Sequence, residues 1–272
     1  MRAIVYGRDT PVAFMPWVGE YGVMLMFWVR YINTVKAPYK IVCCHKGDEP
    51  YFPTANEFFY DWTDPIVDAA KNGTGWRAAD TAEIFDVRDK LYSKYPNASI
   101  MEVFRLPQRP KCFKFCDMAV DLQPVVKRDL KADIVLGCRK RAYNPHKNWI
   151  HWGTAVRAFK AAGYTVGLVG SKPTSFDIEE ADVRAWQFGI DADTNANIEL
   201  IKNAKIYIGT DTGTTHLASM CNTPMIVFKD DSQWEMLTFA LRTNKGYTEH
   251  LEDGWTNPQS VIGSTLRYLK AR

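Results

Sequence analysis

Short apolar runs alternate with longer amphipathic segments along the C-terminal half of the chain. Apolar runs of about four to eight residues bounded by polar turns are typical of buried strands, and the longer segments are typical of helices. The expected strands are 133–137, 164–169, 205–209 and 224–228, and the expected helices are 149–162, 194–203, 214–221 and 257–270. This alternation predicts a parallel sheet covered by helices.

The N-terminal half shows a similar but less regular pattern. The expected strands are 2–6, 39–45 and 98–106, and the expected helices are 23–33 and 81–94. The most hydrophobic stretch, 10–32, is interrupted by Glu20 and Arg30, and its uninterrupted part is shorter than the roughly 20 residues that span a bilayer. We interpret this stretch as a buried helix. The aromatic-rich residues 46–63 are expected to form a loop.

The length and composition indicate a globular protein of two domains and exclude a disordered chain or a disulfide scaffold. The chain has 272 residues, 46% of them hydrophobic and 24% charged, and about 150 residues per domain predicts two domains. The predicted fold class is α/β, with two Rossmann-like domains, 1–128 and 129–272, that face a cleft. In such sheets a ligand binds beyond the carboxyl ends of the strands.

Positive charge is concentrated in one segment, although the whole chain is nearly neutral. The formal net charge is +3, whereas residues 105–147 carry eleven basic side chains against four acidic ones, which leaves −4 for the remaining chain. So mild a net charge neither identifies nor excludes a nucleic-acid binder. We expect the basic segment to lie where a diphosphate, or a nucleic acid, would bind.

The cysteines and the N-terminus predict a soluble, cytoplasmic protein. The six cysteines match no zinc or redox spacing, and we interpret most of them as small buried apolar residues. The N-terminus lacks the basic region, apolar core and cleavage site of a signal peptide, and no segment is long enough to be expected to cross a membrane.

The segment 206–220, Ile-Tyr-Ile-Gly-Thr-Asp-Thr-Gly-Thr-Thr-His-Leu-Ala-Ser-Met, is the one most informative about chemistry. A strand is expected to end at Gly209 and a helix to begin near Thr214, with a small polar turn between them. The amides at a helix N-terminus form a ready phosphate site, Gly213 allows close backbone approach, and Thr214 and Thr215 add hydroxyl donors. A simple helix cap is the alternative interpretation.

These residues carry a resemblance to a known family. Asp211-Thr-Gly-Thr-Thr-His-Leu-Ala218 resembles the Asp-Ser/Thr-Gly-x-x-His-x-Ala signature of the lipopolysaccharide heptosyltransferases, which have the GT-B glycosyltransferase fold. Upstream, 144–149 is similar to that family's Lys-x-Trp element, and the resemblance extends over about 133–228. In the N-terminal half it is limited to 19–22, where Glu20 stands in place of the family's Asp.

The resemblance implies a nucleotide-diphosphate sugar as donor, an N-terminal acceptor-binding domain and a C-terminal nucleotide-sugar-binding domain. It implies that Lys147 contacts the diphosphate and that His216 supports the helix start. The residues that would hold the phosphates and the neighbouring sugar are Asp211, Thr212, Gly213 and Thr214.

Basic residues that follow the strand 133–137 are further candidates for the donor site. Arg139 and Arg141 are expected to grip phosphate, because a guanidinium can donate two parallel hydrogen bonds; a solvated surface position is the alternative. Gly170 and Ser171 end another strand, where they either contact the ribose or base or form a plain tight turn. GT-B enzymes usually stabilise the leaving diphosphate with a helix N-terminus and basic side chains, so we expect no metal and no other cofactor.

Glu20 is the candidate general base, and Asp9 is a second candidate. A transferase that inverts configuration needs a carboxylate near the acceptor hydroxyl to take its proton. Glu20 lies in a glycine-flanked turn beside an apolar helix, and partial burial would raise its pKa toward a useful range. A helix-capping carboxylate is the alternative role for Glu20.

The expected activity is metal-independent, inverting glycosyl transfer to a glycan or a lipid-linked sugar. The alternatives are a DNA glycosyltransferase that modifies a hydroxylated base, a non-catalytic nucleotide-sugar binder, and a GT-B epimerase that acts on the sugar nucleotide itself. Asp191-Ala-Asp193 matches the Asp-x-Asp pattern of metal-dependent transferases, but it precedes an expected helix, which favours a capping role.

Overall fold

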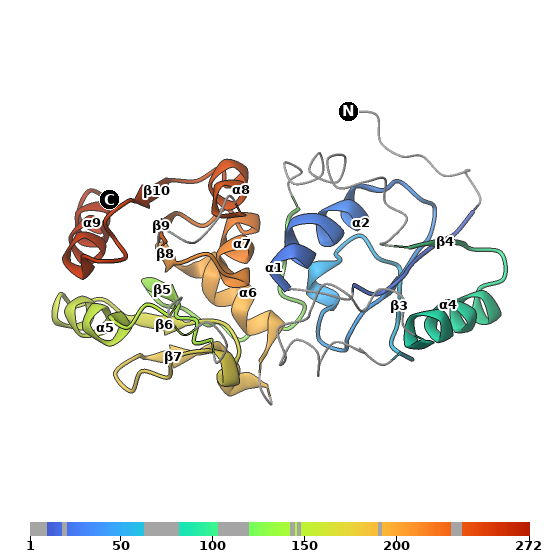
Figure 1. Ribbon diagram of the computed structural model, residues 1–272, viewed down its shortest axis with the longest axis horizontal. Helices are drawn as coiled ribbons and strands as arrows, with labels where there is room; N and C mark the ends of the chain where they lie inside the picture. Colours follow the sequence, from blue (N-terminus) through green and yellow to red (C-terminus); the bar gives the residue numbers. More distant parts are fainter. Residues whose placement is uncertain are drawn as a thin grey trace. The chain divides into compact units, whose positions relative to one another are not determined.

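The computed structural model describes residues 10–17, 21–62, 82–102, 120–141, 145, 148–189, 192–229 and 236–272. The chain forms two compact units, Met1–Val120 and Asp121–Arg272 (Figure 1). Each unit is described by itself. The expected division after residue 128, and the acceptor and nucleotide roles of the two parts, remain predictions.

The described part of the first unit contains a parallel sheet with the strand order β3-β2-β1-β4. Its strands are β1 (Val12–Phe14), β2 (Lys40–Cys43), β3 (Glu57–Phe59) and β4 (Ser99–Met101). Its helical segments are α1 (Tyr21–Val23), a π-helix at Met24–Val29, α2 (Arg30–Thr34), a 3-10 turn at Glu49–Tyr51 and α4 (Ala82–Lys94).

Two of the sequence-based expectations for this unit are wrong. The apolar stretch 10–32 is not one buried helix, because its first part is the strand β1; Pro11 and Pro16 flank that strand and oppose helical backbone there. The aromatic region 46–63 is not all loop, because β3 pairs with β2 at the edge of the sheet. The strand expected at 2–6 lies outside the described residues.

The second unit contains a six-stranded parallel sheet with the order β10-β9-β8-β5-β6-β7. Its strands are β5 (Ile134–Gly137), β6 (Val166–Leu168), β7 (Val183–Arg184), β8 (Ile206–Gly209), β9 (Met225–Phe228) and β10 (Thr248–Leu251). Its helices are α5 (Trp152–Ala161), α6 (Thr194–Asn203), α7 (Gly213–Met220), α8 (Met236–Thr243) and α9 (Pro258–Lys270), with 3-10 turns at Lys172–Thr174 and Ala185–Phe188.

The strand order of the second unit determines where a ligand can bind. The chain builds the sheet outward from β5 in one direction and from β8 in the other, so the order reverses between these two central strands. In doubly wound sheets, ligands bind outside the carboxyl ends of the strands at this switch point. Gly137 and Gly209, the last residues of β5 and β8, are paired across it.

Helices cover both faces of this sheet. Figure 1 shows α5 and α9 on one face, and α6, α7 and α8 on the other. Under the first pair lies an aromatic core in which Trp149, Trp152 and Phe228 are buried in mutual contact. The indole nitrogen of Trp149 donates a hydrogen bond of 3.0 Å to the carbonyl of Trp255, which ties the residues before α5 to those before α9.

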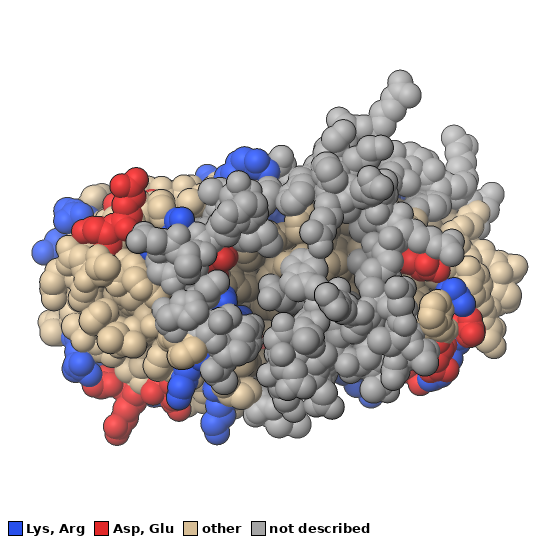
Figure 2. Space-filling view, viewed as in Figure 1, with Lys and Arg blue, Asp and Glu red and all other residues tan. Residues whose placement is uncertain are grey.

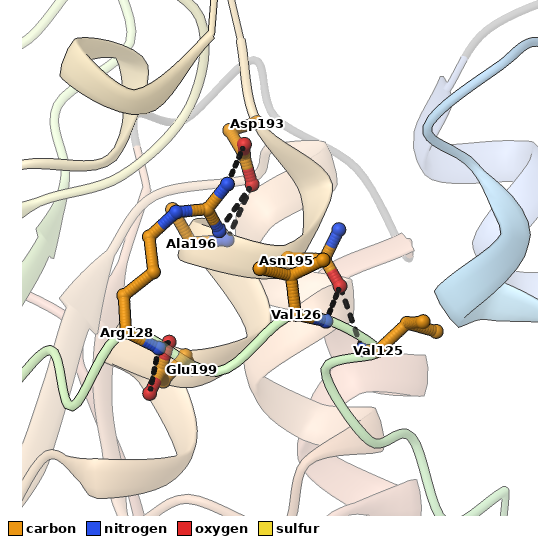
Figure 3. Close-up of polar contacts among 7 residues, drawn as sticks. All are labelled: Val125, Val126, Arg128, Asp193, Asn195, Ala196 and Glu199. Atoms are coloured by element: carbon orange, nitrogen blue, oxygen red, sulfur yellow. Dashed lines mark hydrogen bonds and ion pairs between the residues drawn. The ribbon is translucent and has the colours of Figure 1, made fainter.

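Side chains of helix α6 form hydrogen bonds with residues 125–128, near the start of the second unit (Figure 3). The Asn195 side-chain oxygen accepts from the amides of Val125 and Val126 at 2.7 and 3.0 Å. The buried Glu199 carboxylate accepts from the Arg128 amide with both oxygens, at 3.1 and 2.9 Å. The segment is therefore held along α6 by its backbone groups.

Asp193 supplies the cap that the sequence predicted near this position. Its carboxylate accepts from the Ala196 amide at 2.7 Å at the start of α6, and it also pairs with the Arg128 guanidinium at 2.9 Å. Both side chains are largely shielded from solvent, 12% and 25% exposed. Asp191, the other acid of the Asp-x-Asp pattern, lies outside the described residues.

Replacement of Asp193 by Ala is expected to lower the free energy of unfolding by about 1–3 kcal/mol, because the helix loses its cap and the shielded Arg128 loses its ion partner. Glu180→Gln is the matched control: Glu180 pairs with Arg157 on the surface, and such exposed pairs contribute little. Denaturant unfolding of both variants measures the difference. Equal stability of the two variants would contradict the assigned role of Asp193.

Within the described part of the chain, no helix is both long enough and apolar enough to cross a membrane.

Candidate functional site

A polar turn connects β8 to α7 at the switch point of the second unit. Helix α7 begins at Gly213, and Thr212 is its N-cap with extended backbone, φ −145°. The amides of Thr215 and His216 donate to the Thr212 carbonyl at 3.1 and 3.4 Å. The amides of Gly213 and Thr214 have no partner inside the helix, so they are the groups that an anion at this terminus would meet.

Four hydroxyl groups, three of them on buried residues, form a cluster under this turn. The Tyr207 hydroxyl lies 3.0 Å from Thr214 Oγ1 and 3.0 Å from Thr215 Oγ1. Thr212 Oγ1 lies 3.0 and 3.3 Å from the same two oxygens, and Thr215 Oγ1 donates to the Thr210 carbonyl at 2.5 Å. Tyr207 and Thr215 are fully buried. Burial raises the pKa of Tyr207 to about 12, so its proton stays on the hydroxyl at neutral pH.

The two glycines at the switch point make room for the Tyr207 hydroxyl. A Cβ atom on Gly137 would stand 2.0 Å from that oxygen, and a Cβ atom on Gly209 would stand 2.4 Å from it. The strand ends therefore need glycine because a buried tyrosine occupies the side-chain space of both. Sequence reasoning did not identify Tyr207 or Gly137. The sequence signal that could have pointed to this contact is the glycine at the end of each of the two central strands, β5 and β8.

Arg141 reaches the turn from the loop that follows β5. Its guanidinium Nη2 donates to the Asp211 carbonyl at 3.1 Å. Its backbone is held by Asn148, whose side chain accepts from the Arg141 amide at 2.6 Å and donates to the Arg141 carbonyl at 2.9 Å. The structure thus places Arg141 beside the predicted phosphate turn. Arg139 forms an antiparallel backbone bridge with Ser175.

Gly170 also lies near the start of α7. Its φ of +127° is in the left-handed region, and a Cβ atom there would stand 4.0 Å from Thr214 Cγ2. The Asn197 side chain accepts from the Gly170 amide at 2.8 Å and donates to the Gly170 carbonyl at 3.2 Å, which fixes the loop to α6. Ser171 Oγ lies 2.6 Å from Thr174 Oγ1 within a tight turn. A role for either residue toward a ribose or base remains a prediction.

His216 lies inside the same region, buried, with its Nε2 atom 3.9 Å from Asp211 Oδ1. This distance is too long for a hydrogen bond. Three of the predicted site residues, Lys147, Glu20 and Asp9, lie outside the described residues. The structure brings together the remaining ones at the carboxyl ends of β5, β6 and β8: Arg139, Arg141, Gly170, Ser171, Asp211, Thr212, Gly213, Thr214, Thr215 and His216.

Two of the described basic side chains of the segment 105–147 have partners within the protein. Arg128 is paired with Asp193, and Arg141 donates to the Asp211 carbonyl. On the face of the second unit drawn in Figure 2, Lys and Arg are interspersed with Asp and Glu. Among the residues described, no group of three His, Cys, Asp or Glu side chains could hold a metal ion.

The second unit is a doubly wound α/β sheet with a polar turn and a helix N-terminus at its switch point, the place where sheets of this kind bind phosphorylated ligands. The profile of glycosyltransferase family 9 (heptosyltransferase) matches residues 91–235, more than half of the chain. The chain belongs to this family, and the resemblance inferred from Asp211–Ala218 is confirmed.

A curated relative is lipooligosaccharide heptosyltransferase 2 of Haemophilus influenzae, which is 27% identical over 143 residues. The match spans 49% of this chain and 38% of the relative, so the chain covers well under half the length of that protein.

Solved structures of glycosyltransferases are similar in fold over most of this chain. ADP-heptose LPS heptosyltransferase II of E. coli matches with a TM-score of 0.58 at 15% identity, covering 96% of this chain and 99% of that one. The E. coli heptosyltransferase WaaC with ADP matches with a TM-score of 0.52 at 11% identity, covering 95% and 100%. The iron-containing dodecameric glycosyltransferase TibC of enterotoxigenic E. coli matches with a TM-score of 0.51 at 14% identity, covering 90% and 63%. The predicted GT-B α/β fold is thereby confirmed.

Proposed function

We propose that this protein is a metal-independent, inverting glycosyltransferase that moves a sugar from a nucleotide-diphosphate sugar to an acceptor hydroxyl. The observation that carries the proposal is the turn 210–213 at the switch point of the sheet, where α7 begins and where the Arg141 guanidinium donates to the Asp211 carbonyl. Membership of glycosyltransferase family 9 supports the same reaction class.

The second unit would bind the donor. As the sugar is transferred, negative charge develops on the leaving diphosphate. The amides of Gly213 and Thr214, the positive end of the α7 dipole and Arg141 are the described groups suited to stabilise that charge. Lys147 is proposed to contact the same diphosphate. The first unit is proposed to bind the acceptor and to supply the general base, Glu20, with Asp9 as the second candidate.

The relatives named above suggest which donor and acceptor this protein uses. Two of them are described as an ADP-heptose LPS heptosyltransferase and as a heptosyltransferase with ADP, so an ADP-linked heptose is the first donor to test. A glycan or lipid-linked sugar is the corresponding acceptor. The comparisons lend no support to a hydroxylated base in DNA as the acceptor.

ADP is expected to raise the Tm of the protein, since a ligand at about 100 times its Kd adds about 2.7 kcal/mol to the free energy of unfolding. Arg141→Ala is expected to weaken ADP binding about tenfold or more, because a charge-assisted contact is lost and the Asp211 turn loses its support. Arg157→Ala is the matched control, and its ADP affinity is expected to equal that of the wild type. Arg157 is an exposed residue of α5 that pairs with Glu180. Isothermal titration with ADP, UDP and GDP measures the affinities. If none of the three binds, the proposed donor chemistry is wrong.

Metal independence is tested in the same preparation. Sugar transfer measured by mass spectrometry is expected to continue at an unchanged rate in excess EDTA, because the proposed charge stabilisation uses amides and guanidinium groups. TibC, a structural relative, is iron-containing, so the assay should follow the iron content of the protein as well. Loss of transfer on chelation, restored by a metal, would contradict this part of the proposal.

A further inference from the structure

The hydroxyl cluster beneath the α7 turn has more oxygen–oxygen contacts than it has hydroxyl hydrogens to fill them. Five oxygen–oxygen contacts link Tyr207, Thr212, Thr214, Thr215 and the Thr210 carbonyl. A carbonyl can only accept, so the hydrogen of Thr215 is committed to Thr210, and Thr215 accepts in its other contacts. Three hydroxyl hydrogens remain for the other four contacts.

The shortest contacts give a single direction to this chain of hydrogen bonds. If the longest contact, 3.3 Å between Thr212 and Thr215, carries no hydrogen, then Tyr207 must donate to Thr215. Thr214 must then donate to Tyr207, and Thr212 must donate to Thr214. Any arrangement that satisfies four of the five contacts likewise uses every hydroxyl hydrogen inside the cluster.

We propose that Tyr207 is a positioning residue of the donor site: its buried hydroxyl links Thr214 to Thr215 and so holds the turn 210–215 with the Gly213 and Thr214 amides presented to the diphosphate. This inference rests on the proposed function. If every contact except the longest carries a hydrogen, no threonine hydroxyl hydrogen is left for a phosphate, and the main-chain amides are then the donors of this turn.

The position of Tyr207 suits it to this role. Its aromatic ring comes from β8 and is fully buried, and its hydroxyl fills the space that Gly137 and Gly209 leave open. A rigid, buried ring keeps the hydroxyl at one place, whereas Thr214 is partly exposed at the surface of the turn. Loss of the hydroxyl would remove the donor to Thr215 and the acceptor for Thr214, and the first turn of α7 would lose its internal support.

The test is the affinity of Tyr207→Phe, which keeps the ring and removes only the hydroxyl, for whichever of ADP, UDP and GDP the wild-type protein binds best. We expect an affinity about tenfold lower, the effect of one lost buried hydrogen bond. Tyr247→Phe is the matched control: it also removes a tyrosine hydrogen bond, to Glu249 at 2.6 Å, but at the opposite end of the sheet, just before β10. Its affinity is expected to equal that of the wild type.

A double mutant separates positioning from a general loss of stability. If Tyr207 acts through Thr214, Thr214→Val weakens binding by itself and adds little in the Tyr207→Phe background. Two outcomes would overturn the role of Tyr207 while leaving the donor site in place. One is wild-type affinity in Tyr207→Phe. The other is a double mutant whose loss of affinity equals the product of the losses in the two single variants. A wild-type protein that binds no nucleoside diphosphate would instead overturn the proposed function, and the role of Tyr207 with it.

Discussion

Replacement of Glu20 by Gln is expected to lower the rate of sugar transfer about 10²–10⁴-fold, with little change in the affinity for the nucleoside diphosphate. Glutamine keeps the size and the hydrogen-bonding capacity of the side chain but cannot take a proton from the acceptor hydroxyl. The donor phosphates are assigned to a different part of the chain, so their binding should be preserved. Mass spectrometry of the transferred product and titration with ADP measure the two quantities separately.

Asp9→Asn is the natural comparison, because Asp9 is the second candidate for the same task. If Glu20 is the base, the asparagine variant retains transfer within a few-fold of the wild type. Full activity of Glu20→Gln together with a large loss in Asp9→Asn would reassign the base to Asp9. Full activity in both would remove the general-base assignment from this part of the sequence.

Replacement of Gly137 by Ala is expected to destabilise the protein by about 3 kcal/mol or more. The new methyl group would stand 2.0 Å from the Tyr207 hydroxyl and 2.6 Å from Thr214 Oγ1. Tyr207 is fully buried, so its ring cannot swing into solvent to relieve the contact. The strand must shift, or the hydroxyl cluster must break and leave buried oxygens without partners. Nucleoside diphosphate binding is expected to weaken for the same reason.

Gly263→Ala in helix α9 is the matched control for this substitution. An added Cβ atom there meets only the end of the flexible Arg267 side chain, at 3.3 Å. Alanine is favoured over glycine inside a helix by about 1 kcal/mol, so this variant should be slightly more stable than the wild type. Denaturant unfolding of the full chain measures both. A Gly137→Ala protein as stable as the wild type would mean that Tyr207 does not occupy the described position.

The buried strands and most helices of the second unit could be predicted from the sequence to within about three residues at either end. Strands buried on both faces read as continuous apolar runs, and β5, β8 and β9 are of this kind. The strands that escaped prediction lie at sheet edges: β7 has two residues, and β10 reads Thr-Glu-His-Leu. Edge strands are short and often polar, so their sequences carry no strong apolar signal.

The turn between β8 and α7 was predictable for a local reason, and the Tyr207 hydroxyl beneath it was not. A strand, a glycine, a few small polar residues and a helix follow one another within about fifteen positions, so the sequence by itself determined the strand–turn–helix unit and the family signature within it. It also determined the alternation that makes the fold α/β.

Only the tertiary structure decided what surrounds that turn. Parallel pairing of β5 with β8 places Gly137 beside Tyr207, seventy positions later in the chain, and the loop after β5 brings Arg141 to Asp211. No local pattern encodes such contacts, because they depend on which strands become neighbours and in what register. The buried Tyr207 hydroxyl needs both space and hydrogen-bond partners. The ends of β5 and β8 supply the space, and the first turn of α7 supplies the partners, so only the folded chain brings them together.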